Sequence, residues 1–385
     1  MSTKRRLSAV PIIGDIVRLQ AALRSRRRLR RRVNTLAHML ATGRYRLRWN
    51  LAERVDDAGR SRSPAHALFL QHNDPPSRAH RLAEFAPPQT VEITAPGSAE
   101  QPPDTPADVV LIRGDCTLLL SCDGRHILRL FPDPVPAERI LENWQQLKGG
   151  LNIPDVEHLA NTPRGYYGVR EALITGTTLR ESAPDQVLSG YRDLLSQCAK
   201  HAASADGQYG NEPEARALLD LPLPHWLQTA LRERQQLLLP LLTEAPGLFC
   251  HADCHPANIL VLPSGRVGLI DLERAAWMPF YFDALYMLRM NNAIGNQLRA
   301  HYFQGAFDPQ LDALWRAAGR SFCPDLRLEY LLAVAMAHTL RDQFRHDPPA
   351  KRARKLEKPT RALRPWCASA TPSRAHGDGN ACASS

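Results

Sequence analysis

The sequence lacks an apolar run long enough to cross a bilayer. Its N-terminal apolar stretch, residues 10–17, is short and contains Asp15, whereas a transmembrane helix needs about 20 predominantly apolar residues. No small-residue cleavage site follows this stretch, so we do not expect a secretory signal. The sequence therefore favours a cytoplasmic protein.

The chain also lacks the paired cysteine spacing of a disulfide framework. Its eight cysteines are scattered, and a reducing compartment is the simplest interpretation. Two cysteines and two histidines lie between Cys250 and His255, which raises the question of zinc. A structural zinc site usually needs a second ligand pair at a defined distance, and the sequence offers none, so zinc is not expected.

Aromatic residues and lysines are scarce, whereas arginines are numerous and the net charge is +10. Eight arginines lie between Arg18 and Arg32, and an apolar stripe at residues 29, 33, 36 and 40 has helical spacing. Residues 1–41 could contact the anionic inner face of a membrane as a basic amphipathic helix, or mediate self-association. A nucleic-acid arm is not expected, because the aromatic residues needed for base stacking are missing.

An acid, an amide and a second acid follow one another in residues 249–288. Asp253 precedes Asn258 by five residues, and Asp271 follows thirteen residues later, after a predicted β-hairpin over 259–270. Phosphoryl transfer uses such a set: one carboxylate accepts the proton of the attacking hydroxyl, while an amide oxygen and a second carboxylate hold Mg²⁺.

The residues around these three groups make the pattern specific. Residues 251–258 read HADCHPAN and residues 270–273 read IDLE. The segment resembles the aminoglycoside phosphotransferase and choline kinase-like family, whose loop has the form H-G-D-x-H-P-x-N followed by a strand ending in I-D. Ala252 stands where that family usually has glycine. The resemblance covers roughly residues 107–345 and implies a protein-kinase-like fold.

The resemblance also implies roles for the individual residues. Asp253 is expected to be the catalytic base, and Asn258 and Asp271 are expected to be the metal ligands. Four further residues would support the loop: His251, His255, Pro256 and Asp283, the last as a helix N-cap or loop anchor. The implied cofactors are ATP and Mg²⁺.

An upstream nucleotide-binding lobe is expected in three strands near residues 109–112, 117–120 and 126–130. Gly114 lies in the turn that would cover the phosphates. Arg129 stands where kinases usually present a lysine to the phosphates, and it keeps the charge but differs in shape. Two acids complete the nucleotide site, namely Glu142 as the expected partner of Arg129, with Glu138 as runner-up, and Glu171 near the hinge.

The expected fold class is α+β: a two-lobed protein-kinase-like fold with a small antiparallel β N-lobe, a mainly helical C-lobe and a basic helical extension. Composition divides the chain further. We expect a basic amphipathic helical extension (1–60), a Pro-rich linker (61–106), the N-lobe (107–175), the helical catalytic lobe (176–345) and a disordered tail (346–385).

The expected function is ATP- and Mg²⁺-dependent transfer of the γ-phosphoryl group to a hydroxyl of a small molecule. Sugars, aminoglycosides and amino alcohols all fit the resemblance, and the positive charge mildly disfavours a cationic acceptor. The alternative is a catalytically inactive kinase-like binding or scaffold protein, held at the membrane by its basic N-terminus. This alternative gains from the missing lysine and loses because all three site residues are present.

Overall fold

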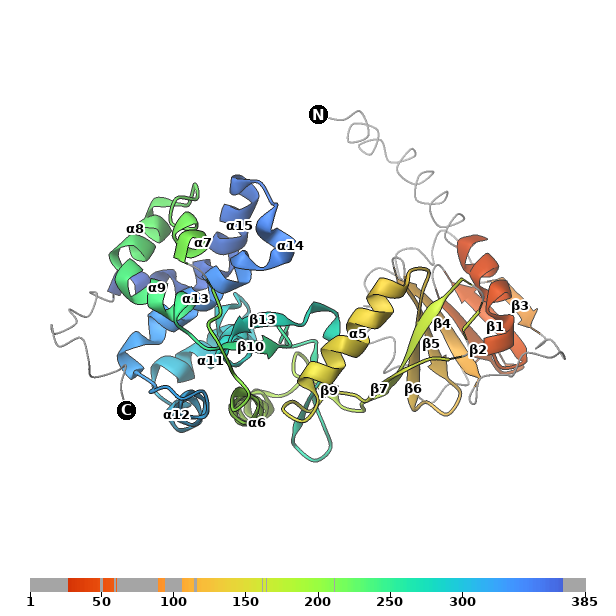
Figure 1. Cartoon of the computed structure of the whole chain (residues 1–385). Helices are drawn as coiled ribbons and strands as arrows, with labels where there is room; N and C mark the ends of the chain where they lie inside the picture. Colours follow the sequence, from red (N-terminus) through yellow and green to blue (C-terminus); the bar gives the residue numbers. More distant parts are fainter. Residues whose placement is uncertain are drawn as a thin grey trace, which may run out of the picture. The chain divides into compact units, whose positions relative to one another are not determined.

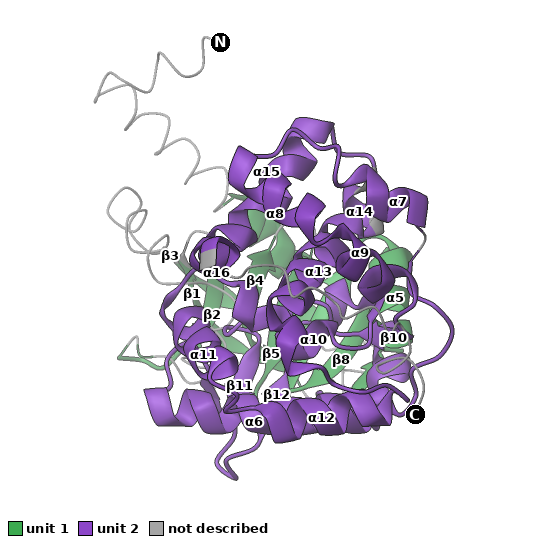
Figure 2. Ribbon diagram, turned by 90° about the vertical axis from the view of Figure 1, so that its left-hand side faces the viewer, with its two compact units in different colours: residues 1–142, 154–174 green, residues 143–153, 175–385 purple. Residues whose placement is uncertain are grey.

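The computed structural model describes residues 27–48, 51–58, 60, 89–93, 106–113, 116–160, 162–163, 165–210 and 212–369. The chain divides into two compact units (Figure 2). Unit 1 comprises residues 1–142 and 154–174, and unit 2 comprises residues 143–153 and 175–385. The expected α+β class, with an antiparallel β lobe and a helical lobe, is confirmed.

Unit 1 is built on one antiparallel sheet, which has eight strands within the described residues. Their order is β3-β1-β2-β4-β5-β6-β8-β7. The strands are β1 (Gly43–Arg48), β2 (Leu51–Val55), β3 (Gln89–Ile93), β4 (Ala107–Arg113), β5 (Cys116–Ser121), β6 (His126–Phe131), β7 (Val156–His158) and β8 (Tyr167–Ala172).

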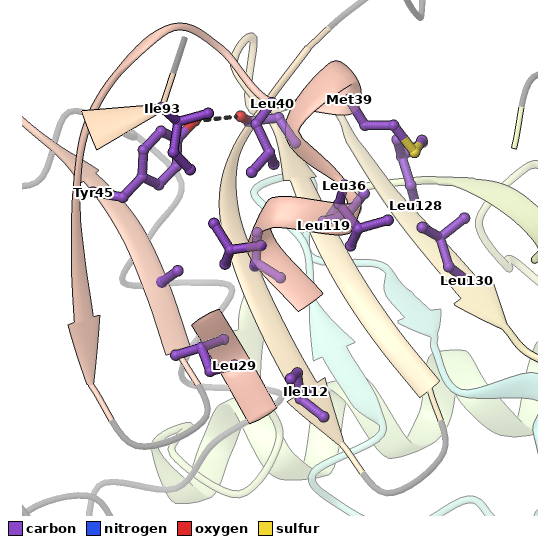
Figure 3. Close-up of a cluster of buried hydrophobic side chains, with 14 of the residues drawn as sticks. Leu29, Leu36, Met39, Leu40, Tyr45, Ile93, Ile112, Leu119, Leu128 and Leu130 are labelled. Carbon is purple, nitrogen blue, oxygen red and sulfur yellow. Dashed lines mark hydrogen bonds between the residues drawn. The ribbon is translucent and has the colours of Figure 1, made fainter. Parts of the chain in front are cut away.

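Both faces of this sheet are apolar, because consecutive residues of its central strands are apolar and their side chains point alternately to opposite faces. In β4, Val109 and Leu111 belong to one buried cluster, while Val110 and Ile112 belong to the other. The second cluster also takes in Leu29 and is shown in Figure 3. A sheet buried on both faces explains why its central strands read as near-continuous apolar runs.

The arginine-rich N-terminal segment is part of unit 1. A helix at residues 27–35 is followed by the short 3-10 helix η1 (Ala37–Met39). The predicted apolar stripe, residues 29, 33, 36 and 40, is at most 2% exposed and packs against the sheet (Figure 3). Because the stripe is buried against the sheet, it is not available as the apolar face of a free amphipathic helix.

The domain boundaries differ from the expected ones, because β1, β2 and β3 extend the sheet instead of preceding it. β2 pairs directly with β4, and the pair is reinforced by an ion pair between Arg54 and Asp108 at 2.9 Å. Cross-strand partners Arg46 and Glu53 also form an ion pair, although Glu53 is fully buried. Residues 61–88 of the expected linker lie outside the described residues.

The division between the two units falls inside α5 (Pro134–Leu147). In unit 2, β11 (Ile259–Val261) and β12 (Val267–Leu269) form the predicted hairpin, with β9 (Thr177–Thr178) beside β11. β10 (Gly247–Cys250) pairs with β13 (Ala276–Pro279).

Helices make up most of the rest of unit 2, as Figure 1 shows. The longer ones are α6 (Pro184–Ala202), α8 (His225–Glu233), α9 (Gln235–Thr243), α11 (Ala293–Phe303), α12 (Asp308–Ala317), α13 (Arg327–Leu340) and α15 (Pro349–Thr360). Short ones are α7 (Glu212–Ala217), η2 (Leu272–Arg274), α10 (Phe282–Leu285), η3 (Tyr286–Arg289), η4 (Pro324–Leu326), α14 (Asp342–Arg345), η5 (Arg361–Leu363) and α16 (Arg364–Ser369).

The tail from residue 346 was expected to be disordered, yet residues 349–369 are helical. Ala353 and Leu356, three residues apart on α15, are both buried. This short apolar face packs the otherwise basic helix against α13. Residues 370–385 lie outside the described residues. Within the described ranges no helix combines the length and apolarity needed to cross a membrane.

Candidate active site

The loop over residues 251–258 is anchored by a buried carboxylate. Asp283 is 3% exposed, and its two oxygens accept the backbone N–H groups of His251 at 2.7 Å and Ala252 at 2.8 Å. Asp283 lies in the first turn of α10, whose N-cap is Tyr281, so of its two expected roles it is the loop anchor and not the helix N-cap. The carboxylate ties the loop to the helical core of unit 2. Both carboxylate oxygens are thereby satisfied inside the protein, as buried polar atoms require.

Ala252 has a left-handed backbone, with φ at 59°. This is the position where the resemblance expects glycine, and the structure gives the reason, because glycine adopts positive φ without steric cost. An alanine here costs about 1–2 kcal/mol. The conformation is held from outside, since the buried guanidinium of Arg341 donates to the carbonyl of Ala252 at 2.7 Å and to that of Arg274 at 2.5 Å.

His251 links the loop to the end of β12 and is fully buried. Its Nε2 lies 2.9 Å from the carbonyl oxygen of Ile270, and the N–H of Asp253 donates to its Nδ1 at 3.4 Å. Both contacts suit the tautomer that carries its proton on Nε2. The residue therefore fixes the distance between the Asp253 loop and the residue before Asp271.

The carboxylate of Asp253 is held by three side chains. Oδ1 accepts the hydroxyl of Tyr286 at 2.8 Å. Oδ2 lies 3.3 Å from Nδ2 of Asn258 and 3.6 Å from Nε of the exposed Arg274. The sequence reasoning missed Tyr286, which lies 33 residues downstream in η3, and no pattern connected the two.

The β11–β12 hairpin brings Asn258 and Asp271 together. Asn258 precedes β11 and Asp271 follows β12, and the N–H of Ile270 donates to the carbonyl oxygen of Asn258 at 3.0 Å. Asp271 turns the chain with φ at 70°. The NH₂ group of Asn258 faces Asp253, which leaves its amide oxygen for a cation.

Amide and carboxylate oxygens are hard donors that suit Mg²⁺, so these residues fit the implied metal. Among the described residues, no group of three or more His, Cys, Asp and Glu side chains is arranged to hold a metal ion.

His255 and Pro256 shape the turn before β11. The N–H of Asn258 donates to the carbonyl of His255 at 2.7 Å, and the N–H of Ala257 donates to Nδ1 of His255 at 3.2 Å. Burial lowers the pKa of His255, although the nearby Asp253 carboxylate acts in the opposite direction. The carbonyl of Pro256 accepts the N–H of Arg180 at 3.1 Å.

Cys254 in the same loop is a structural cysteine. Its side chain is fully buried, and burial followed by the charge of Asp283 raises the pKa of its thiol well above the usual value. A buried thiol with a raised pKa is a poor nucleophile.

The arginines Arg274, Arg289 and Arg341 lie near Asp253 in unit 2. The guanidinium of Arg289 stacks 4.0 Å from the centre of the Tyr286 ring and is only 7% exposed. Among the described residues its Nε finds no hydrogen-bond partner. Burial lowers the pKa of Arg289, while Tyr286 and Asp253 act to raise it. Asp253 is thus an acid within a positively charged setting.

In unit 1, Arg129 and Glu171 form a buried ion pair at 2.7 Å on the neighbouring strands β6 and β8. Alternation places Arg129 on the sheet face of Ile127. Glu142 on α5 is exposed, so its pairing with Arg129 stays a prediction. Gly114 lies outside the described residues.

Comparison with known proteins decides the family. A model of the phosphotransferase enzyme family matches residues 118–319, just over half of the 385-residue chain. The chain belongs to this family. The expected resemblance and the expected enzyme class, a small-molecule kinase, are thereby confirmed. No curated protein matches this phosphotransferase at a significant level.

Similar solved structures include a thermostable mutant of aminoglycoside phosphotransferase APH(4)-Ia, at 16% identity over 68% of this chain and 94% of that chain, with a TM-score of 0.44. Macrolide 2'-phosphotransferase MphH from Brachybacterium faecium shares 18% identity over 64% of this chain and 89% of that chain, with a TM-score of 0.42. Because these TM-scores are below 0.5, the assignment rests on the family model.

Proposed function

We propose that the protein transfers the γ-phosphoryl group of ATP to a hydroxyl of a small molecule, with Asp253 as the base. The observation that supports this most is the fixed carboxylate of Asp253, which Tyr286, Asn258 and Arg274 hold on a loop anchored by Asp283. A candidate base must present a fixed oxygen to the proton it abstracts, and this arrangement supplies one.

In the proposed reaction, Asp253 accepts the proton as the acceptor oxygen forms its bond to the γ-phosphorus. The bond between the γ-phosphorus and the bridging oxygen breaks, and ADP leaves. Asn258 and Asp271 would hold Mg²⁺, which supplies positive charge to the phosphates when bound. Most of the rate enhancement then comes from positioning and charge neutralisation.

In unit 1, Arg129 is the residue proposed to contact the phosphates, with Glu171 holding its guanidinium. Glu142 and the turn at Gly114 belong to the same proposed nucleotide site. Arginine offers two parallel N–H donors to phosphate oxygens, so it can replace lysine as a charge while changing the geometry.

The charges near Asp253 bear on the acceptor. Arg274 lies beside the carboxylate, and Arg289 and Arg341 are buried behind it. A polycationic acceptor would meet like charge there. A neutral or anionic hydroxyl compound, such as a sugar or a sugar acid, is therefore favoured over an aminoglycoside.

Thermal-shift titration with ATP and GTP, with and without Mg²⁺, tests the nucleotide site. Binding to the folded state raises apparent stability by mass action, so we expect a Mg²⁺-dependent shift that Asp271→Ala abolishes. Asp220→Ala, an exposed aspartate of unit 2, is the matched control and should keep the shift. No shift with either nucleotide would contradict the proposal.

Turnover is tested separately by ADP release with a panel of hydroxyl compounds, in wild type and Asp253→Asn. General-base catalysis is worth about 10²–10⁴-fold, so the variant should bind nucleotide normally and lose turnover by that factor. Nucleotide binding without turnover on any acceptor would instead favour the inactive binding protein. The family match lends that alternative no support.

A further inference from the structure

The exposed side of the helix at residues 27–35 carries a concentration of arginines. Arginines at positions 27, 28, 31 and 32 fall on one face by helical spacing. On the opposite face Leu29, labelled in Figure 3, and Val33 are fully buried against the sheet. The residues that line this side, together with one aromatic from the segment before β8, form the arginine hollow: Arg27, Arg28, Arg31, Arg32, Thr35 and Tyr166.

The arginine hollow is an open depression of the surface. Its volume is about 490 Å³, which lies within the range of small-ligand sites. The guanidinium of Arg32 stacks 5.0 Å from the centre of the Tyr166 ring, so one cation is held in place by a side chain from a distant part of the sequence. Thr35 donates its hydroxyl to the carbonyl of Arg31 at 3.0 Å, one turn earlier.

This arrangement costs stability in the absence of an anion. Arg27 and Arg31 are like charges one turn apart, and such a pair is unfavourable by about 0.2–0.5 kcal/mol. Arg32 is half-buried, and burial and the charge of Arg28 both lower its pKa. None of the six lining residues is acidic. A bound anion would relieve both effects.

We propose that the arginine hollow binds a ligand that carries a phosphate group. Guanidinium groups form paired hydrogen bonds with phosphate oxygens, and the volume leaves room for a body beyond the phosphate. The phosphate could belong to a soluble compound or to a lipid headgroup. A lipid would be held through its headgroup alone, since the apolar side of this helix is buried in the protein.

The test compares two double variants that remove equal charge. Arg27→Gln with Arg31→Gln removes two exposed arginines of the hollow, whereas Arg30→Gln with Arg44→Gln removes two exposed arginines outside it. All four side chains are exposed, so both variants should fold with the wild-type Tm. Asp271→Ala serves as a third variant, which separates the arginine hollow from the proposed nucleotide site.

Two probes distinguish the sources of the phosphate. Pyrophosphate, measured by calorimetry without Mg²⁺ at about 0.15 M salt so that weak surface attraction is screened, represents a soluble ligand. Sedimentation with phosphatidylglycerol vesicles, against phosphatidylcholine vesicles, represents a lipid surface and also tests contact of residues 1–41 with a membrane. We expect at least one probe to bind the wild type and the control double variant.

For that probe, we expect binding at least tenfold weaker in the hollow double variant and unchanged in Asp271→Ala. Pyrophosphate alone would assign a soluble ligand, and vesicles alone would assign a lipid headgroup. Equal losses in the two double variants would overturn the proposal by showing non-specific charge attraction. Absence of binding by both probes would overturn it too, as would loss only in Asp271→Ala or preferential binding of duplex DNA over both probes.

Discussion

One histidine with a buried ring nitrogen should make the stability of unit 2 depend on pH. His338 on α13 stacks on Phe282 with ring centroids 6.5 Å apart, and its Nδ1 is buried without a hydrogen-bond partner among the described residues. Burial, followed by the charges of Arg289, Arg341, Lys355 and Arg274, lowers its pKa from the usual 6.5 to about 2.

The direction of the effect follows from proton binding. Between pH 2 and 6.5 the unfolded chain binds a proton at His338 and the folded chain does not, so stability falls as the pH falls below 6.5 and is constant above about 7. Each pH unit corresponds to about 1.4 kcal/mol. Lowering the pH to 5 should therefore cost about 2 kcal/mol from this group.

Urea unfolding between pH 8 and pH 5 measures the effect, and His338→Gln removes the titrating group. The variant should lose less of its stability than the wild type over this range, by about 2 kcal/mol. His225→Gln, on an exposed histidine of α8, is the matched control and should keep the wild-type dependence. If His338→Gln shows the same pH slope as the wild type, the reasoning from burial and surrounding charge is wrong.

Three further predictions follow from the site and its supports. Tyr286→Phe removes a hydrogen bond to the Asp253 carboxylate, so kcat should fall about tenfold or more with the KM for ATP unchanged; an unchanged kcat would contradict a positioning role. Arg234→Met leaves Glu329, which lies 3.2 Å from Arg234 and is 5% exposed, as a buried acid without its ion-pair partner. Urea unfolding should show a loss of about 3–5 kcal/mol in stability. The control Arg232→Met, on an exposed arginine, should be near neutral. Iodoacetamide should leave Cys254 unlabelled in the folded protein, and rapid labelling below the unfolding midpoint would refute its burial.

The candidate active site could be predicted from the sequence because its residues are close in the chain. The hairpin between Asn258 and Asp271 has apolar strands and a turn at residues 263–265. The loop before it consists largely of residue types that have specific conformational or chemical roles. Tyr286 was missed since a contact made across 33 residues leaves no periodic or spacing signal. Glu171 was predicted for the nucleotide site, but its pairing with Arg129 across a strand pair was not.

Among the N-terminal strands, β2 and β3 were missed, and for a different reason. β1 and β2 present charged residues at cross-strand positions, and Arg46 and Glu53 bury these charges as an ion pair. Sequence patterns assign such residues to the surface, because the partner that neutralises them is not visible. The helix at residues 27–35 was predicted correctly as amphipathic, but the pattern could not tell whether its apolar face packs on a membrane, on another copy or on the same chain.

The pairing of Arg129 with Glu171 has a consequence for control of the enzyme. Protein kinases are commonly switched by a helix that brings a glutamate to the strand cation or takes it away. Here one glutamate that pairs with Arg129, Glu171, is carried by the adjacent strand β8, which the sheet's own hydrogen bonds join to β6. A displacement of α5 would leave this ion pair in place. On the proposed role of Arg129, the cation that contacts the phosphates is therefore positioned by the sheet itself, and a movement of α5 would act through its own residues, such as the proposed Glu142.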